Sequence, residues 1–121
     1  MAYRVLILLT NMIDHAGIPE ALDQAGVSSD VVCLSNVPSV IEEQVQFGTS
    51  QLLITGMIHS DVQSTVAFAK KMRGKNQLIS VYIYTEYNSF DLPKSVFDAR
   101  IQKRPLELAL ATKSFLVQDM K

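Results

Sequence analysis

Five short apolar runs, spaced along the whole chain, constrain its fold more than any other feature. They span residues 3–9, 30–34, 51–54, 78–85 and 99–103, and patterns typical of helices separate them. Strands that alternate with helices predict an α/β protein built on a parallel sheet. The first and third runs are almost continuously apolar, as in strands that helices cover on both faces, so we expect them at the centre of the sheet.

The composition predicts one compact domain. The chain has 121 residues, of which 48% are apolar and 19% are charged, and this balance is typical of a folded rather than a disordered protein. We therefore expect a single domain over residues 1–121. The formal net charge of -1 provides no global attraction to nucleic acid or to an anionic membrane, so we expect neither as a direct partner.

Two further features bear on the cellular setting. The apolar stretch at residues 5–9 is too short for the core of a signal peptide or for a membrane span, which predicts a cytoplasmic protein. The single cysteine, Cys33, lies in the apolar run 31–34. We interpret it as a small buried side chain in a reducing compartment.

The helices are predicted from their boundary residues. A first helix is expected over residues 19–25 and ends at Gly26. A second opens at residues 36–38, with a proline in its first turn, and closes at Gly48. A third begins with a capping box at residues 60–63 and is broken at residues 74–76.

The last helix opens at Pro105 and has a long, largely apolar stripe, most of which we expect to pack on the sheet. This stripe consists of Leu106, Ala109, Leu110, Lys113, Leu116, Val117 and Met120. Between the fourth and fifth strands, Pro93 allows only a short helix, which we place at residues 92–97.

Polar residues follow the strands where each one ends. In an open parallel sheet, ligands bind outside the carboxyl ends of the strands. The residues at these ends are Thr10 and Asn11 after the first strand, Thr55 after the third, Thr85 after the fourth and Arg104 after the fifth. These five residues form the pocket that the sequence predicts.

With these strand ends, the chain resembles the receiver domain of two-component response regulators over essentially its whole length. The resemblance implies a CheY-like, flavodoxin-like (βα)5 three-layer sandwich with a parallel five-stranded sheet of order 2-1-3-4-5. Receivers have a Ser or Thr at the end of the fourth strand and Lys-Pro after the fifth. Thr85 keeps the hydroxyl position, and Arg104 with Pro105 stands where Lys-Pro is expected, with Lys103 one residue earlier as a substitute.

The acidic residues of receivers are absent. Thr10 and Asn11 stand where receivers have an acidic pair, and Thr55 stands at the phosphoacceptor aspartate. Phosphotransfer in receivers needs a carboxylate nucleophile and a magnesium ion held by oxygen ligands. A neutral threonine hydroxyl would need a base, and no residue is assigned that role. The resemblance therefore implies a degenerate receiver, or pseudo-receiver, that is no enzyme and uses no cofactor and no metal.

Several residues at the same edge leave more than one interpretation open. Arg104 could meet an external anion, the Glu86 carboxylate or solvent. His15 and His59 lie in strand-to-helix loops, where they could join nearby acids in a metal site, act as a general base or be solvated. Their spacing matches no known zinc arrangement, and the isolated glycines form no phosphate-binding loop.

A further surface is predicted around the fourth and fifth strands. Tyr82 and Tyr84 share one face of the fourth strand, where they pack under a helix or form a partly exposed aromatic surface. In receivers, the fourth helix, fifth strand and fifth helix commonly bind a partner or a second copy of the domain. Carried over by position, this face uses Tyr87, Phe90, Lys94, Arg100, Gln102 and Lys113.

The sequence thus predicts a phosphorylation-independent, receiver-like signalling module that acts by protein–protein interaction. Its partner is a protein of a signalling or regulatory pathway, or a second copy that meets the last helix and strand. The alternative is a small-molecule sensor that binds an anionic ligand in the pocket at the strand ends. A third hypothesis is a small enzyme with His15 or His59 as general base.

Overall fold

The structure is a parallel α/β sandwich, as the sequence predicts. A computed structural model describes residues 3–86 and 92–119. Its five parallel strands lie in the order β2-β1-β3-β4-β5, which confirms the expected order 2-1-3-4-5 with the first and third strands inside the sheet. The strands are β1 (Val5–Leu8), β2 (Val32–Ser35), β3 (Leu52–Thr55), β4 (Ser80–Tyr84) and β5 (Ala99–Ile101).

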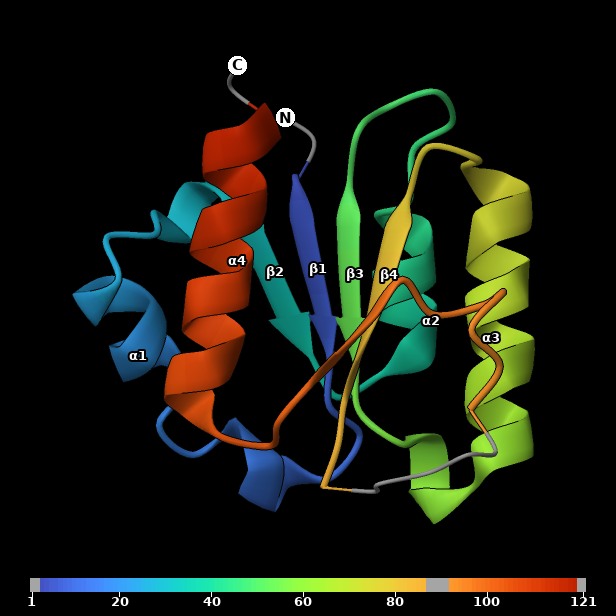
Figure 1. Cartoon of the computed structure of the whole chain (residues 1–121), viewed down its shortest axis with the longest axis horizontal. Coiled ribbons are helices and arrows are strands. Elements are labelled where there is room, and N and C mark those ends of the chain that lie inside the picture. The colour runs from blue at the N-terminus through green and yellow to red at the C-terminus, as the bar shows by residue number, and fades with distance from the viewer. Residues whose placement is uncertain (1–2, 87–91, 120–121) are drawn as a thin grey trace.

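Helices cover both faces of the sheet (Figure 1). On one face lie α1 (Ile18–Gln24) and α4 (Pro105–Asp119), and on the other lie α2 (Pro38–Glu43) and α3 (Val62–Lys75). Three short 3-10 turns, at Met12–His15, Ser29–Val31 and Ile58–Ser60, complete the regular elements of the described chain. Within that part of the chain, no helix is both long and apolar enough to cross a membrane.

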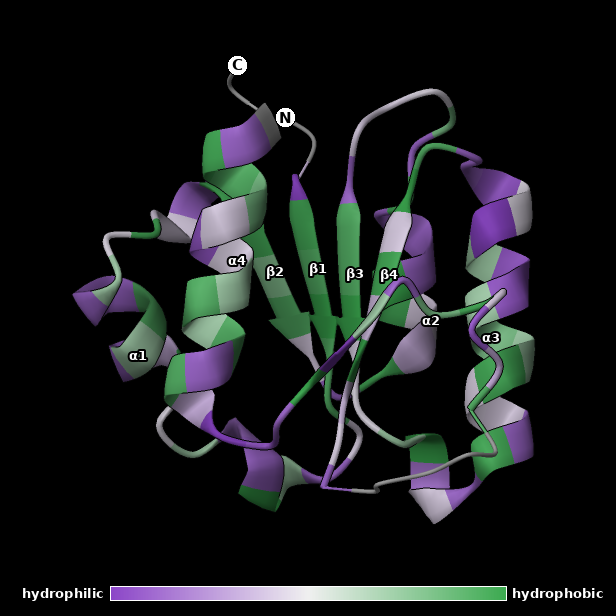
Figure 2. Ribbon diagram, viewed as in Figure 1, coloured by the Kyte–Doolittle hydropathy of each residue, from purple (hydrophilic) through white to green (hydrophobic). Residues whose placement is uncertain are grey.

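The sheet separates two hydrophobic cores, and β1 contributes to both. All four residues of β1 are fully buried. Val5 and Ile7 pack with residues of α1 and α4, whereas Leu6 and Leu8 pack with residues of α2 and α3. The alternation follows from the two-residue period of a strand. It explains why the strand is hydrophobic along its whole length (Figure 2).

The second helix is shorter than predicted because a buried side chain competes for its backbone. It ends at Glu43 rather than at Gly48. The Gln51 side chain is fully buried. Its Nε2 donates to the backbone carbonyl of Gln44 (2.9 Å), and its Oε1 accepts from the backbone amide of Gln46 (2.9 Å). These backbone groups are thus satisfied outside a helix, and the expected continuation to Gly48 was wrong.

The start of α3 also differs from the prediction. Its N-cap is Asp61, whose carboxylate accepts hydrogen bonds from the amides of Gln63 and Ser64, rather than Ser60. The Ser64 hydroxyl also donates to Asp61, and this bond lowers the pKa of that carboxyl. The helix continues through Gly74 to Lys75 and ends at Asn76.

The stripe predicted for the last helix is rotated in the structure. Leu106 and Leu110 are 55% and 50% exposed, and Val117 is 45% exposed, so most of the predicted stripe faces away from the sheet. Ala109 is fully buried and Leu116 packs against the core, as predicted, and Leu108, outside the predicted stripe, is fully buried as well. Met120 lies outside the described residues. The helix is apolar around much of its circumference, so apolar spacing alone could not select the buried face.

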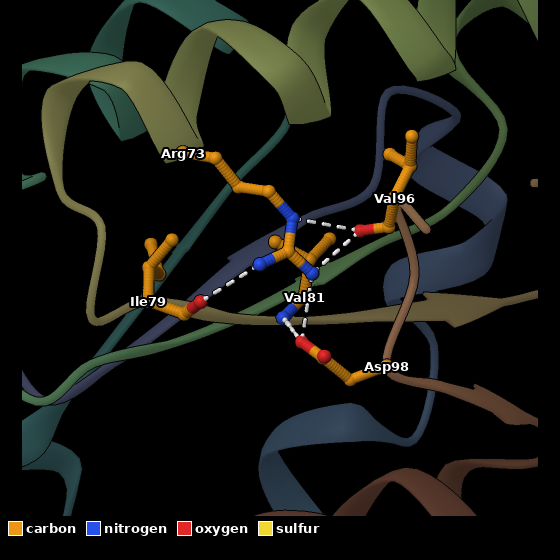
Figure 3. Close-up of polar contacts among 5 residues, drawn as sticks. All are labelled: Arg73, Ile79, Val81, Val96 and Asp98. Carbon is orange, nitrogen blue, oxygen red and sulfur yellow. Dashed lines mark hydrogen bonds and ion pairs between the residues drawn. The ribbon is translucent and has the colours of Figure 1, made fainter. Parts of the chain in front are cut away.

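No helix forms at residues 92–97, where the sequence predicts one; the segment is a turn. Arg73 of α3 explains the difference (Figure 3). Its Nε and Nη2 donate to the Val96 carbonyl at 2.9 and 2.6 Å, and Nη1 donates to the Ile79 carbonyl at 3.4 Å. Nη2 also donates to Asp98 at 2.9 Å. A side chain from another element therefore supplies hydrogen bonds to this non-helical segment.

Replacing Arg73 with Gln should lower the free energy of unfolding by about 2 kcal/mol, because hydrogen bonds from a charged group to Val96 and Asp98 are lost. Urea denaturation followed by circular dichroism measures the change. Lys70→Gln removes one cation from an exposed position of the same helix and should leave the stability within about 0.5 kcal/mol. Equal effects of the two changes would contradict the assigned role of Arg73.

Candidate functional site

A cleft of about 630 Å³ opens at the carboxyl ends of β1, β3 and β4. This is the edge at which the sequence predicts a pocket, and it is where ligands bind in sheets of this kind. Residues that follow β1, β3, β4 and β5 line the cleft together with Tyr84 and Val62: Thr10, Asn11, Asp14, Met57, His59, Ser60, Thr85, Glu86 and Lys103.

The structure brings together three of the five predicted pocket residues. Thr10, Asn11 and Thr85 line the cleft, whereas Thr55 and Arg104 are not among its lining residues. Thr55 is fully buried, and its hydroxyl donates to the Gly56 carbonyl at 2.8 Å. The Thr55 hydroxyl, which the sequence resemblance places at the phosphoacceptor position, is therefore closed to solvent and donates its proton within the protein.

The turn after β1 uses several of the polar groups at this edge. The Asn11 side chain accepts a hydrogen bond from the Ile13 amide (3.1 Å) and caps the 3-10 turn Met12–His15. The His15 ring donates from Nε2 to the Leu9 carbonyl (2.7 Å). His15 thus holds the turn against the end of β1, and Nδ1 is the ring nitrogen left to accept a proton.

An ion pair joins two sides of the cleft. Lys103, which follows β5, lies 3.0 Å from the Asp14 carboxylate in the turn after β1. Both side chains are partly shielded, with 33% and 19% exposure, so solvent screens the pair less than it would a fully exposed one. Lys103, which the sequence suggested as the substitute for a receiver lysine, is the cation on the cleft lining.

Tyr84 packs in the core and also lines the cleft. It is 3% exposed and belongs to the core beneath α1 and α4, which confirms the core interpretation for Tyr84, whereas Tyr82 packs against the same core and stays partly exposed. Burial raises the pKa of Tyr84 to about 12, and the carboxylates of Asp14 and Glu86 add to the shift. Its hydroxyl has no hydrogen-bond partner within residues 3–86 and 92–119 and is a protonated donor at neutral pH.

Two adjacent residues beside the cleft have left-handed backbone conformations. His59 and Ser60 have φ angles of 52° and 58°, which cost about 1 to 3 kcal/mol each for residues with a side chain. The Thr65 hydroxyl accepts from the Ile58 amide (2.8 Å), and Thr10 accepts from the His59 amide (3.4 Å). The sequence has no glycine here and gave no signal of this turn.

The histidines and acids near the cleft do not converge on one point. Across the described residues, no three His, Cys, Asp or Glu side chains lie close enough together to hold a metal ion.

Cys33, in β2, is partly buried, and this burial raises the pKa of its thiol, which disfavours the reactive thiolate.

A second hollow, of about 310 Å³, adjoins the cleft and shares Glu86 and Lys103 with it. Its other lining residues are Arg100, Gln102 and Arg104. The Arg100 guanidinium donates to the Thr85 carbonyl (3.2 Å), which fixes its position beside the end of β4. The Arg104 side chain makes no hydrogen bond or ion pair with any residue in the described ranges. The hollow is thus lined by the cations Arg100, Lys103 and Arg104 and by one carboxylate, that of Glu86.

The predicted interaction face is divided in the structure. Lys94, Arg100 and Gln102 are exposed at the β5 edge of the sheet. Lys113 lies beside Gly26, at the end of α1. Tyr87 and Phe90 lie outside the described residues.

Comparisons with known proteins support the fold alone. No family model matches the chain, and no curated protein sequence matches it significantly. A crystal structure of a protein described as a pilus assembly protein (cpaE) from Burkholderia thailandensis has a similar fold, with a TM-score of 0.64. The match covers 94% of this chain and 98% of that one at 13% sequence identity.

The pKa of Tyr84 makes stability depend on alkaline pH. A tyrosine of ordinary pKa near 10 in the unfolded chain loses its proton before the folded one does, since the folded value is about 12. The protonated form stabilises the fold below pH 10, and this contribution is lost as the pH rises toward 12.

We expect the free energy of unfolding of the wild type to fall relative to that of Tyr84→Phe between pH 10 and pH 12. Parallel urea titrations of the two proteins, with Tyr82→Phe as control, measure it; parallel pH profiles would contradict the assignment.

Proposed function

We propose that this chain is a receiver-like regulatory module that binds a protein partner and transfers no phosphoryl group. The observation that carries the proposal is the state of Thr55. At the end of β3 the side chain is fully buried, has no carboxylate and donates its proton to Gly56. An incoming phosphodonor would find no accessible nucleophile there.

The other requirements of phosphotransfer are also unmet at this edge. Magnesium prefers oxygen ligands, with carboxylates as the usual protein contribution. Thr10 and Asn11 stand where receivers have two acids, and the Asn11 oxygen is already used to cap the turn after β1. The Asp14 carboxylate is paired with Lys103. These contacts support a module that works by binding and transfers no phosphoryl group.

The β5 surface, defined as Lys94, Arg100, Gln102 and Arg104, is suited to a protein partner. All four side chains are exposed, and three carry positive charge. An acidic partner surface would associate faster with this edge, and charge would contribute more to selectivity and encounter rate than to affinity. The structural neighbour, described as a pilus assembly protein, is consistent with a module that acts within a protein assembly.

Incubation with acetyl phosphate and magnesium, followed by intact mass measurement, tests the absence of phosphotransfer. We expect no phosphoryl adduct on the wild-type chain. The variant with Thr10→Asp, Asn11→Asp and Thr55→Asp restores the acids of receivers and is the matched comparison, once its circular dichroism shows that it folds. An adduct on wild-type protein would refute the proposal directly.

An anionic-ligand sensor is the second candidate, and one observation favours it. Arg100, Lys103 and Arg104 line the hollow beside the cleft against the Glu86 carboxylate. Lys103 is paired with Asp14, whereas Arg104 is unpaired in the described part of the chain. A ligand that binds only the native state raises the melting temperature. We expect inorganic phosphate to raise it in wild type and in Lys113→Gln, but less in Arg104→Gln. Equal responses of all three proteins at constant ionic strength would remove this candidate.

A further inference from the structure

The β2 strand is an open edge of the sheet and carries no charge. Within the described chain it pairs with β1 alone, and its sequence is Val-Cys-Leu-Ser. All four residues are partly exposed. Most proteins protect such an edge with charged side chains, proline, bulges or a covering element, because its free backbone groups can accept another strand. The opposite edge has this protection, since β5 and its flanks carry Lys94, Arg100 and Arg104.

The backbone groups of the β2 edge follow from the strand register. The Ser35 carbonyl accepts from the Leu9 amide of the chain after β1 (3.1 Å), so alternate residues of β2 direct their backbone toward β1 and the others direct it outward. Leu34 thus presents both its N–H and its C=O at the edge. Val32 presents only its carbonyl, because its amide donates to Ser29 in the preceding 3-10 turn.

An apolar groove of about 440 Å³ lies between this edge and α1. Val32 and Leu34 of β2 form one side, and Pro19 and Leu22 of α1 form the other. Val32 and Leu34 are partly buried against the core beneath α1 and α4. Side chains of an added strand would alternate between the two faces of the sheet, so every second one would enter this groove.

The charged side chains around the groove are mainly acidic, although the Lys113 ammonium lies beside Gly26, next to the lining residue Val27. Asp23 lines the groove, and Glu20 and Asp30 adjoin lining residues in the sequence. All three are exposed, and none forms an ion pair with another described residue. Two copies joined through their β2 edges would bring these carboxylates together, which costs stability. A positively charged segment would instead find unpaired charges of opposite sign.

We propose that the β2 edge binds an extended segment of a partner protein in which every second residue, the set on the α1 side of the sheet, is either apolar or Lys or Arg. The segment adds a strand to the sheet through Leu34 and the Val32 carbonyl and places apolar side chains in the groove. Its cations lie on the α1 side of the sheet, the same side as Asp23, which lines the groove. This inference rests on the proposed function, because it names one surface where a protein partner docks.

Strand addition has a local signature that other modes of binding lack. The probe, called the Lys-Val peptide, is a synthetic peptide in which Lys and Val take turns at every second position with Ser between them. The same peptide with Glu in place of Lys is its control. We expect the Lys-Val peptide to bind at least about tenfold more tightly and to slow hydrogen exchange at the Leu34 amide. The affinity should fall as salt is raised. Unchanged exchange at Leu34 with the peptide bound would overturn the proposal.

Charge reversal tests the partner's chemistry. The double variant Asp23→Lys and Asp30→Lys should bind the Lys-Val peptide about tenfold more weakly, whereas Glu43→Lys, an exposed change on α2, should bind it within about twofold of wild type. Equal weakening in both variants contradicts the assignment. Protection of Leu34 that rises with protein concentration and without peptide would make a second copy the occupant and overturn the proposal. The phosphodonor result does not depend on β2, so the two proposals fail separately.

Discussion

The Arg73 guanidinium fixes the part of the molecule on which the cationic edge depends. It donates to two backbone carbonyls and to Asp98, whose carboxylate also accepts from the Val81 amide (2.8 Å). One side chain of α3 therefore joins the start of β4 to the chain that enters β5 (Figure 3). Because β5 has only three residues, its place in the sheet relies on this contact as well as on its ladder with β4. The positions of the cations at the end of β5 therefore depend on the Arg73 contacts.

The strands could be predicted because a short, nearly continuous apolar run between turn residues has few possible structures other than a buried strand. The run predicted at 51–54 differs from β3 by one residue at each end. Predictions failed where side chains distant in sequence decide the outcome. Gln51 ends α2 early, and Arg73 stabilises a turn where a short helix was expected. The face of α4 was misassigned because both of its sides are apolar, which spacing cannot resolve.

For the site, the sequence identified the right edge but not the orientation of each side chain. The carboxyl ends of parallel strands meet at one edge, so Thr10, Asn11 and Thr85 were expected together and do line the cleft. Thr55 was assigned to the same pocket, yet its hydroxyl turns to the Gly56 carbonyl. Position along a strand fixes the edge that a residue occupies, whereas its rotamer depends on local hydrogen bonds. The neighbours Lys103 and Arg104 divide in the same way, since only Lys103 lines the cleft.

The cleft and the β2 groove share no lining residue, although one short stretch of chain contributes to both. Asn11 and Asp14 face the cleft, and Pro19 and Leu22 face the groove a few residues later. Because the two linings are separate, an occupant of the groove would leave every lining residue of the cleft open to a second molecule.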